Sequence, residues 1–211
     1  MRPLSASQLK QLLLSSLLLG ASLAQATVLK EPAWQSLLDK GQLEELEQAA
    51  QARLKQSPAD LQAQIALAMV ARDGSDAKAM EAAVRTMEQC VAQQPREAVC
   101  HYALGQVLGT QAMSASMFKA ISLSGKIKDA FSRAVELDPA MPEARAALQQ
   151  FYLMAPGVAG GSLPKAAQLA AEVRESLPEL AKLMRARVAQ QEDKIADAER
   201  ELLSIKPGAD A

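Results

Sequence analysis

The sequence has little of what several large classes of protein need. Among its 211 residues there is one histidine and no asparagine, and only 3% of the residues are aromatic. With His101 as the single histidine, a zinc site built from several histidines is excluded. Lysine and arginine (23) nearly balance aspartate and glutamate (24), so the chain has neither the basic charge nor the aromatic platforms of a nucleic-acid-binding protein. Nucleic acid is therefore not an expected partner.

The first 26 residues have the features of a secretory signal peptide. Their only charged residues are Arg2 and Lys10, an apolar run extends from Leu12 to Leu23, and small residues surround a cleavage position after Ala26. An uncleaved anchor helix is the alternative, but an apolar run of about a dozen residues is shorter than the ~20 that span a bilayer. We therefore expect residues 1–26 to be removed and the mature protein to be periplasmic, without a stable membrane span.

Residues 27–207 are predicted to be all-α, with a short tail at 208–211. Strong helix formers dominate throughout, and no segment alternates apolar and polar residues as a half-buried strand does. Five prolines divide the region at intervals of 29 to 44 residues: Pro58, Pro95, Pro139, Pro178 and Pro207. We expect each proline to close a helix, because the residue before proline disfavours helical backbone.

The helices that end at these prolines carry a narrow apolar stripe. Residues 12, 8 and 5 positions before each proline share one helical face. Thirteen of these fifteen are apolar, the full set being Leu46, Ala50, Arg53, Ala83, Met87, Cys90, Ile127, Phe131, Ala134, Ala166, Ala170, Val173, Ile195, Glu199 and Leu202. A second helical segment precedes each stripe, so each unit is predicted to be a helical hairpin.

One unit defines the pattern best. Residues 98–139 place a large residue, Leu-Gly and another Leu on the first helix, and Ile, Phe, Ala and Pro on the second: His101, Leu104, Gly105, Leu108, Ile127, Phe131, Ala134 and Pro139. This pattern resembles the tetratricopeptide repeat (TPR) family, over about residues 30 to 207. The resemblance implies a single domain built as an α-solenoid of stacked antiparallel hairpins, in about five degenerate repeats at approximately 27–60, 61–97, 98–141, 142–178 and 179–207. Arg53 and Glu199, the polar members of the stripes, fit end units that face water.

Proteins that resemble this family bind partners in a concave groove lined by the first helices of successive repeats. Carried over to this sequence, the pattern places nine residues toward such a groove: Gln35, Asp39, Met69, Arg72, Asp73, Tyr102, Gln106, Gln150 and Met154. The asparagine-and-lysine clamp that some members use for a peptide carboxylate is excluded, because the chain has no asparagine.

Two hypotheses of function remain. The first is a non-enzymatic exported scaffold or adaptor that binds another protein, or an extended peptide segment, along this groove. The alternative is a small-ligand-binding component resembling the T-component of TRAP-type transporters, which also use helical-hairpin repeats. An open groove favours the first hypothesis, and a closed apolar cavity favours the second. The expected lining of that cavity is aromatic: Tyr102, Phe118, Phe151 and Tyr152.

The two cysteines are predicted to form a disulfide. Cys90 ends the closing helix of the second unit and Cys100 lies in the first turn of the next helix. Stacked hairpins make these helices neighbours, and export leads to an oxidising compartment. Cys90, Cys100 and His101 are an incomplete set of metal ligands, so no metal is predicted.

Two segments stand outside the repeat pattern, and each has a structural and a functional interpretation. The insert at 110–125 spaces Met113, Met117, Phe118 and Ile121 roughly as on a helix, so the first helix of its unit is expected to run long. These side chains either complete the core or form an apolar lip that contacts a ligand. The glycine-rich loop at 156–164 either lengthens a connection or offers N–H groups to an anion where a helix begins at Ser162.

Signals for an enzyme are weak. Ser116 and Lys119 match the pattern Ser-x-x-Lys, but the Ser-Asp-Asn and Lys-Thr-Gly motifs that accompany it are absent. The glycine-rich loop lacks the Gly-Lys-Ser/Thr ending of a phosphate-binding loop. We therefore predict no catalytic residue and no cofactor.

Overall fold

The structure, a computed structural model, describes residues 28–74 and 76–206. The predicted signal peptide at 1–26, Pro207 and the tail at 208–211 lie outside the described residues. The prediction of an all-α protein is confirmed for the described part of the chain, which contains helices and no strand. The elements are α2 (Pro32–Asp39), α3 (Leu43–Gln56), α4 (Leu61–Asp73), α5 (Ala77–Gln93), α6 (Ala98–Met113), α7 (Met117–Leu137), α8 (Pro142–Met154), the short 3-10 helix η1 (Gly157–Ala159), α9 (Leu163–Glu172), α10 (Pro178–Gln191) and α11 (Ile195–Leu203).

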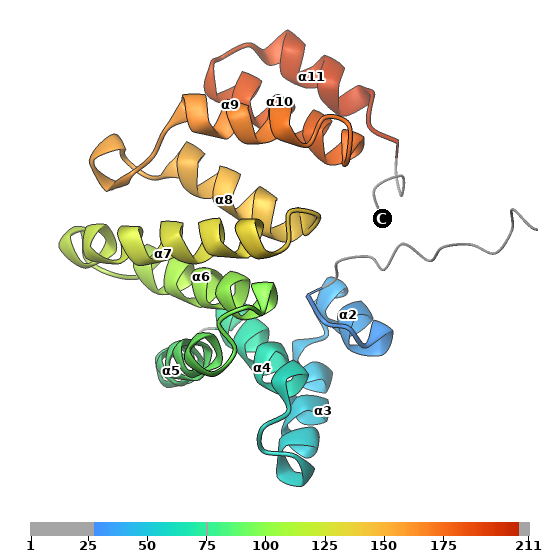
Figure 1. Ribbon diagram of the computed structural model, residues 1–211, viewed down its shortest axis with the longest axis vertical. Helices are drawn as coiled ribbons and strands as arrows, with labels where there is room; N and C mark the ends of the chain where they lie inside the picture. Colours follow the sequence, from blue (N-terminus) through green and yellow to red (C-terminus); the bar gives the residue numbers. More distant parts are fainter. Residues whose placement is uncertain (1–27, 75, 207–211) are drawn as a thin grey trace, which may run out of the picture.

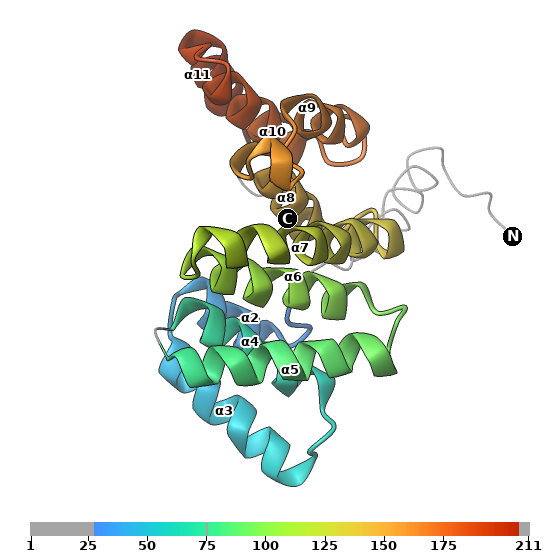
Figure 2. The same ribbon diagram turned by 90° about the vertical axis from the view of Figure 1, so that its left-hand side faces the viewer.

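From α3 to α11 the helices follow one another along the molecule broadly in chain order, and α2 lies back beside α4 (Figure 1). Each helix from α2 to α10 packs against the next one in the sequence, and α6 lies between α5 and α7 (Figure 2). A second set of contacts joins even-numbered helices: α2 with α4, α4 with α6, α6 with α8, and α8 with α10. The even-numbered helices therefore form a continuous inner row, and the odd-numbered helices lie outside it.

The turns after α3, α5 and α7 share one backbone conformation. The residues before the prolines, Ser57, Gln94 and Asp138, have φ between -139° and -130° and ψ between 65° and 87°. Each donates its N–H to the carbonyl of the residue four positions earlier, which satisfies a carbonyl at the helix end. The prediction that Pro58, Pro95 and Pro139 follow the end of a helix is confirmed.

The same three prolines accept a side-chain hydrogen bond from the following helix. The side chain six residues after the proline donates each time, over 3.2 Å from Gln64 to Pro58, 3.1 Å from His101 to Pro95 and 2.7 Å from Arg145 to Pro139. His101 and Arg145 are buried by this arrangement. Three different residue types thus perform one structural role, which is to tie α4, α6 and α8 to the turns before them.

Pro178 differs from the expectation that every proline closes a helix. It is the first residue of α10, whereas α9 already ends at Glu172. The residue before it, Leu177, still has φ -135° and donates to the carbonyl of Val173, as in the other turns. A proline fits the first helical turn because the N–H that it lacks has no partner there in any case.

The apolar stripes are buried in every hairpin except the last. All eleven apolar members before Pro178 are buried: Leu46, Ala50, Ala83, Met87, Cys90, Ile127, Phe131, Ala134, Ala166, Ala170 and Val173. In α11 the expected members Ile195 and Leu202 are exposed, and Ala198 is the buried residue instead. The prediction fails there because, among the residues that the structure describes, α11 packs only against α10, which covers a narrower face of the helix.

The insert lengthens both helices of its hairpin. Helix α6 has 16 residues and, as expected, is longer than the other even-numbered helices. Most of the inserted residues, however, form the first turns of α7, which has 21 residues. The end of this hairpin therefore extends beyond the hairpins on either side of it.

The predicted disulfide between Cys90 and Cys100 is confirmed. It joins the last turn of α5 to the first turn of α6, with the two Cα atoms 5.7 Å apart.

None of the described helices combines the length and hydropathy that a membrane span needs.

Candidate functional site

The nine residues expected to face a groove all lie on even-numbered helices. Helix α2 carries Gln35 and Asp39, α4 carries Met69, Arg72 and Asp73, α6 carries Tyr102 and Gln106, and α8 carries Gln150 and Met154. The structure divides them into three groups with different surroundings: buried, paired and pocket-lining.

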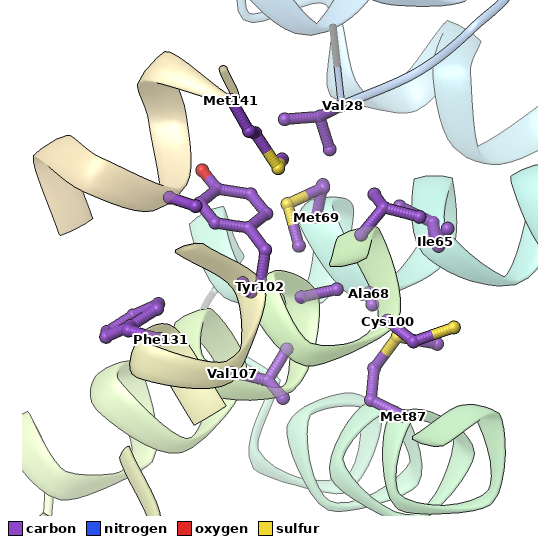
Figure 3. Packing of buried hydrophobic residues seen from close by; sticks show 14 of the residues in the cluster. Val28, Ile65, Ala68, Met69, Met87, Cys100, Tyr102, Val107, Phe131 and Met141 are labelled. Atoms are coloured by element: carbon purple, nitrogen blue, oxygen red, sulfur yellow. The ribbon is translucent and has the colours of Figure 1, made fainter. Parts of the chain in front are cut away.

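Two of the nine belong to the core. Met69 is fully buried and Tyr102 is 5% exposed. Both pack beside Val28, from the segment before α2, and Met141, from the turn before α8 (Figure 3). Burial raises the pKa of Tyr102 to about 12, with the charge of Arg72 opposing. Because both side chains are buried, they stabilise the packing of the helices and are not accessible to a partner.

Four of the nine are polar residues that pair locally. The Gln35 amide donates to Asp39 over 2.7 Å, and the Arg72 guanidinium makes two hydrogen bonds to the carboxylate of Asp73. The hydrogen bond to Asp73 is the main reason why the pKa of Arg72 is raised. Because the Arg72–Asp73 pair is neutral overall, it offers a partner little net charge.

The remaining three, Gln106, Gln150 and Met154, line one pocket. Its volume is about 670 Å³, within the range of pockets that hold small ligands or anchor side chains. Its walls come from α6, α7, α8 and η1: Gly105, Gln106, Gly109, Thr110, Ala112, Met113, Met117, Ala120, Ile121, Ser124, Ile127, Phe131, Ala147, Gln150, Phe151, Met154, Ala155, Pro156, Val158 and Ala159. We call this the apolar pocket.

None of the described residues in the wall of the apolar pocket has an ionisable side chain. Its polar side chains are two amides and two hydroxyls, and the other lining residues are apolar or glycine. Four large apolar side chains that line it are 66–88% exposed, and we call them the apolar rim: Met113, Met117, Met154 and Val158. Large apolar side chains gathered at the surface mark places where a ligand or partner binds, and methionine adapts its shape to such partners.

The insert and the glycine-rich loop meet at this pocket. Met113, Met117 and Ile121 come from the insert, whereas Pro156 and Val158 come from the loop. Contacts between α7 and η1 hold the two segments together. The apolar-lip interpretation of the insert thus agrees with the geometry, because its side chains lie open at a pocket rather than in the core.

The glycine N–H groups that lead into α9 are already bonded within the loop and are not free for an anion. The N–H groups of Gly160, Gly161 and Ser162 donate to the carbonyls of Gly157, Pro156 and Tyr152, over 2.8–3.1 Å. Gly160 has φ +99°, a conformation that favours glycine, and it lies against the ring of Phe151. The loop therefore serves as a fixed wall of the pocket. Ser162 caps α9 as the sequence predicted, by accepting from the N–H of Lys165.

A glycine in α6 keeps the pocket open. Nothing lies within 4 Å of where a Cβ of Gly109 would stand, so packing inside the protein does not require glycine there. Glycine in the interior of a helix costs about 1 kcal/mol relative to alanine. Gly105, one turn earlier, is different, because Phe131 fills its space. Gly109 thus preserves a volume that the protein itself leaves unfilled.

The aromatic cavity expected for a small-ligand-binding protein is not the one observed in the described residues. Of its four predicted members only Phe151 lines the apolar pocket. Tyr102 is buried in the core, Phe118 points to solvent at 88% exposure, and the ring of Tyr152 lies 5.7 Å from the ammonium group of Lys165.

Two other pockets are smaller than the apolar pocket. One of about 410 Å³ lies between α3, α4 and α5, and another of about 400 Å³ lies beside His101, whose Nε2 already bonds Pro95. No group of three or more potential metal-ligating side chains occurs among the residues that the structure describes.

Comparison with known protein families and with functionally described proteins finds no match. The chemistry of the apolar pocket is therefore the basis on which a function can be argued.

Proposed function

We propose that the protein is a non-enzymatic, exported, TPR-like scaffold that binds a segment of another protein in the apolar pocket. The absence of ionisable groups from the pocket wall supports binding rather than acid–base or metal chemistry. The observation that carries the proposal is the apolar rim, because its exposed side chains continue the apolar surface of the pocket out to the molecular surface, as a contact with another protein requires.

The TPR-like architecture is supported by two features of the described chain. Neighbouring hairpins contact each other through their first helices, the even-numbered row. Three successive junctions repeat the same turn, with the same bond from a side chain six residues after the proline. A stack of hairpins in which each contacts only its neighbours has this pattern. We propose five units, at about 27–60, 61–97, 98–141, 142–178 and 179–207.

The disulfide supports export to an oxidising compartment such as the periplasm. Disulfides persist outside the cytoplasm, where reducing systems do not keep thiols reduced. Recovery of a protein that begins at Thr27 from a periplasmic extract would test both the export and the predicted cleavage after Ala26.

A second candidate is the binding of a small apolar ligand, as in proteins resembling the T-component of TRAP-type transporters. The volume of the apolar pocket favours it, because about 670 Å³ can enclose such a molecule. The two candidates differ in whether the apolar rim is covered as well as the pocket.

The experiment that tests the proposal fills the pocket from within. Gly109→Leu places a side chain into open space in the pocket wall, and Gly125→Leu makes the same change at an exposed helical glycine with nothing within 4 Å and no part in the pocket. A photo-cross-linking residue at Met117, in the exported protein in intact cells, should capture one protein. That product should disappear with Gly109→Leu and persist with Gly125→Leu.

The outcomes separate the two candidates. A cross-linked product that survives Gly109→Leu contradicts binding in the pocket. A small molecule that co-purifies with the wild-type protein in native mass spectrometry, is lost in Gly109→Leu, and leaves Met117 without a protein cross-link favours the second candidate.

A further inference from the structure

The methionines of the described chain fall into two separate groups. Three of them, Met113, Met117 and Met154, are 83%, 76% and 66% exposed, and all three line the apolar pocket. The others are buried, at no more than 8% exposure: Met69, Met80, Met87, Met141 and Met184. Every methionine that solvent reaches freely in the described part of the chain therefore belongs to the apolar rim.

The three exposed methionines come from three helix ends. Met113 is the last residue of α6, Met117 is the first residue of α7, and Met154 is the last residue of α8. These three helices all contact one another. Thioethers from separate parts of the sequence thus share one rim because of the fold, and not because they are neighbours in the chain.

These thioethers are the accessible reduced sulfur of the described chain. The two cysteines of the sequence are joined in the disulfide between Cys90 and Cys100, so no thiol competes for an oxidant. A two-electron oxidant such as hydrogen peroxide converts a thioether into a sulfoxide. A sulfur lone pair attacks one peroxide oxygen, the S–O bond forms, the O–O bond breaks, and the second oxygen leaves as water after proton transfer. The sulfur loses the two electrons that the peroxide gains.

Oxidation would change the polarity of the rim. A thioether is apolar, whereas a sulfoxide is polar and its oxygen accepts hydrogen bonds. An apolar surface that covers the rim would remove water from each sulfoxide oxygen without replacing its hydrogen bonds, which opposes binding. The pocket wall offers little compensation, because only four of its described residues have polar side chains: Gln106, Thr110, Ser124 and Gln150.

One of these amides is placed to stabilise an oxidised methionine. The side-chain N–H of Gln150 donates to the sulfur of Met154, four residues later on the same face of α8. A thioether sulfur is a weak hydrogen-bond acceptor. An oxygen added to this sulfur would offer the amide a stronger acceptor, so the polar group of oxidised Met154 would be held at the edge of the pocket.

We propose that Met113, Met117 and Met154 are a site of reversible oxidation, and that their conversion to sulfoxides prevents a partner from binding in the apolar pocket. Methionine sulfoxide reductases, one for each sulfoxide epimer, would restore the thioethers and the binding. This inference rests on the proposed function and adds its regulation.

The test uses the purified mature protein, with the neutral apolar fluorophore N-phenyl-1-naphthylamine as the probe of the pocket. Fluorescence titration measures its affinity before and after treatment with hydrogen peroxide, and mass spectrometry of proteolytic peptides measures the oxygen added at each methionine. We expect the rim methionines to be oxidised before the buried ones, because the oxidant reaches exposed sulfur first. Their oxidation should weaken probe binding about tenfold or more, because the polar sulfoxides lose water to an apolar molecule. Treatment with both reductases should restore the affinity.

Leucine variants make the assignment specific. Leucine and methionine have similar volume and apolar character, but leucine has no sulfur to oxidise. The triple variant Met113→Leu/Met117→Leu/Met154→Leu should bind the probe and keep its affinity after peroxide treatment. Met80→Leu, at a buried position that does not line the pocket, should respond to peroxide as the wild-type protein does. Circular dichroism establishes that each protein is folded before and after oxidation.

The possible failures are distinct. Unchanged probe affinity in wild-type protein whose three rim methionines carry oxygen overturns this inference and leaves the proposed function standing. An equal loss of affinity in the triple leucine variant, or oxidation of the buried methionines before those of the rim, also overturns this inference alone. Absence of probe binding to the unoxidised protein, or probe binding that Gly109→Leu does not weaken, overturns both proposals.

Discussion

Phe131 of α7 occupies the space that a side chain at position 105 of α6 would need. A Cβ on Gly105 would overlap the ring of Phe131, which is 6% exposed and lies with its centroid 6.3 Å from that of Tyr102. The Leu-Gly pair that the sequence shares with the TPR pattern thus has a physical reason here. The missing side chain lets the two helices of the hairpin approach each other.

The two glycines of α6 should respond oppositely to alanine. Gly105→Ala forces the Phe131 ring to move, and overpacking of this kind costs about 1–3 kcal/mol. Gly109→Ala meets no atom and should be neutral or stabilise the protein by up to about 1 kcal/mol. Urea unfolding of the two variants measures the difference. A Gly105→Ala protein as stable as wild type would show that the ring adapts without cost.

Removal of the Phe131 ring should be more costly than either glycine change. Phe131→Ala leaves a cavity between α6 and α7, and buried Phe→Ala substitutions cost about 3–5 kcal/mol. A shift of the urea midpoint to lower concentration with an unchanged slope is the expected result. An unchanged thermal or urea transition would contradict the packing described here.

The disulfide should stabilise the protein, because it restricts the unfolded chain by closing a loop. Since this loop is short, we expect a contribution of about 2–3 kcal/mol. The double variant Cys90→Ser/Cys100→Ser and the reduced wild-type protein should unfold at the same lower urea concentration. Thiol titration of the native protein should find no reactive thiol. Two reactive thiols in the native protein, purified without reductant, would contradict the bond.

Glu143 should make the protein less stable at neutral pH than its amide would. Burial raises the pKa of Glu143, the charges of Asp138 and Asp39 add to the effect, and its Oε2 is buried without a hydrogen-bond partner among the described residues. A carboxyl whose pKa is higher in the folded state loses stability as pH rises through that pKa. Glu143→Gln should therefore have a higher Tm than wild type at pH 7.

The advantage of Glu143→Gln should disappear at low pH. Below about pH 4 the wild-type carboxyl is protonated in the folded and the unfolded chain alike, so both proteins should then melt together. Differential scanning calorimetry across this pH range checks the sign. A lower Tm for Glu143→Gln at pH 7 would show that the charged form is stabilised in the fold.

A bidentate ion pair joins the last helix to α10. Arg185 donates two hydrogen bonds of 2.8 Å to the Glu201 carboxylate, which lowers the pKa of Glu201. This contribution is present above the ordinary pKa of glutamate and is lost as pH falls. At pH 7, Glu201→Gln should speed amide hydrogen exchange in α11 and leave α3 unchanged. The matched variant Glu199→Gln, exposed on the same helix, should exchange like wild type.

Much of the helical framework was predictable because it depends on local signals. Proline position, helix propensity and the three-four spacing of apolar residues predicted an all-α chain and the buried stripes of α3, α5, α7 and α9. They also led to the pairing of Cys90 with Cys100. The predicted stripe of α11 was wrong, because the neighbouring helix covers a different face. The predicted role of Pro178 was also wrong, because proline fits both the position after one helix and the first turn of the next.

The candidate site was only partly predictable, because it depends on which segments meet. The sequence identified the insert and the glycine-rich loop as two separate features. Their contact could have been predicted, because the insert follows α6 and the loop follows α8, which are the first helices of neighbouring hairpins. Met69 and Tyr102 were expected at a surface, but Val28 and Met141 pack beside them, and no local pattern announces that contact. The open space at Gly109 could not be inferred, because helical glycine serves close packing at Gly105 and an empty pocket one turn later.

Each helix packs only against near neighbours in the sequence, since helix–helix contacts among the described residues extend no farther than the second helix along. Pulling on α11, or proteolysis there, would therefore unfold the helices one after another from the C-terminal end. Severing the chain between α9 and α10 would deprive α8 and α9 of one neighbour and leave every contact among α2 to α7 in place. The walls of the apolar pocket lie N-terminal to such a cut. A C-terminally shortened protein should therefore still bind a partner in this pocket.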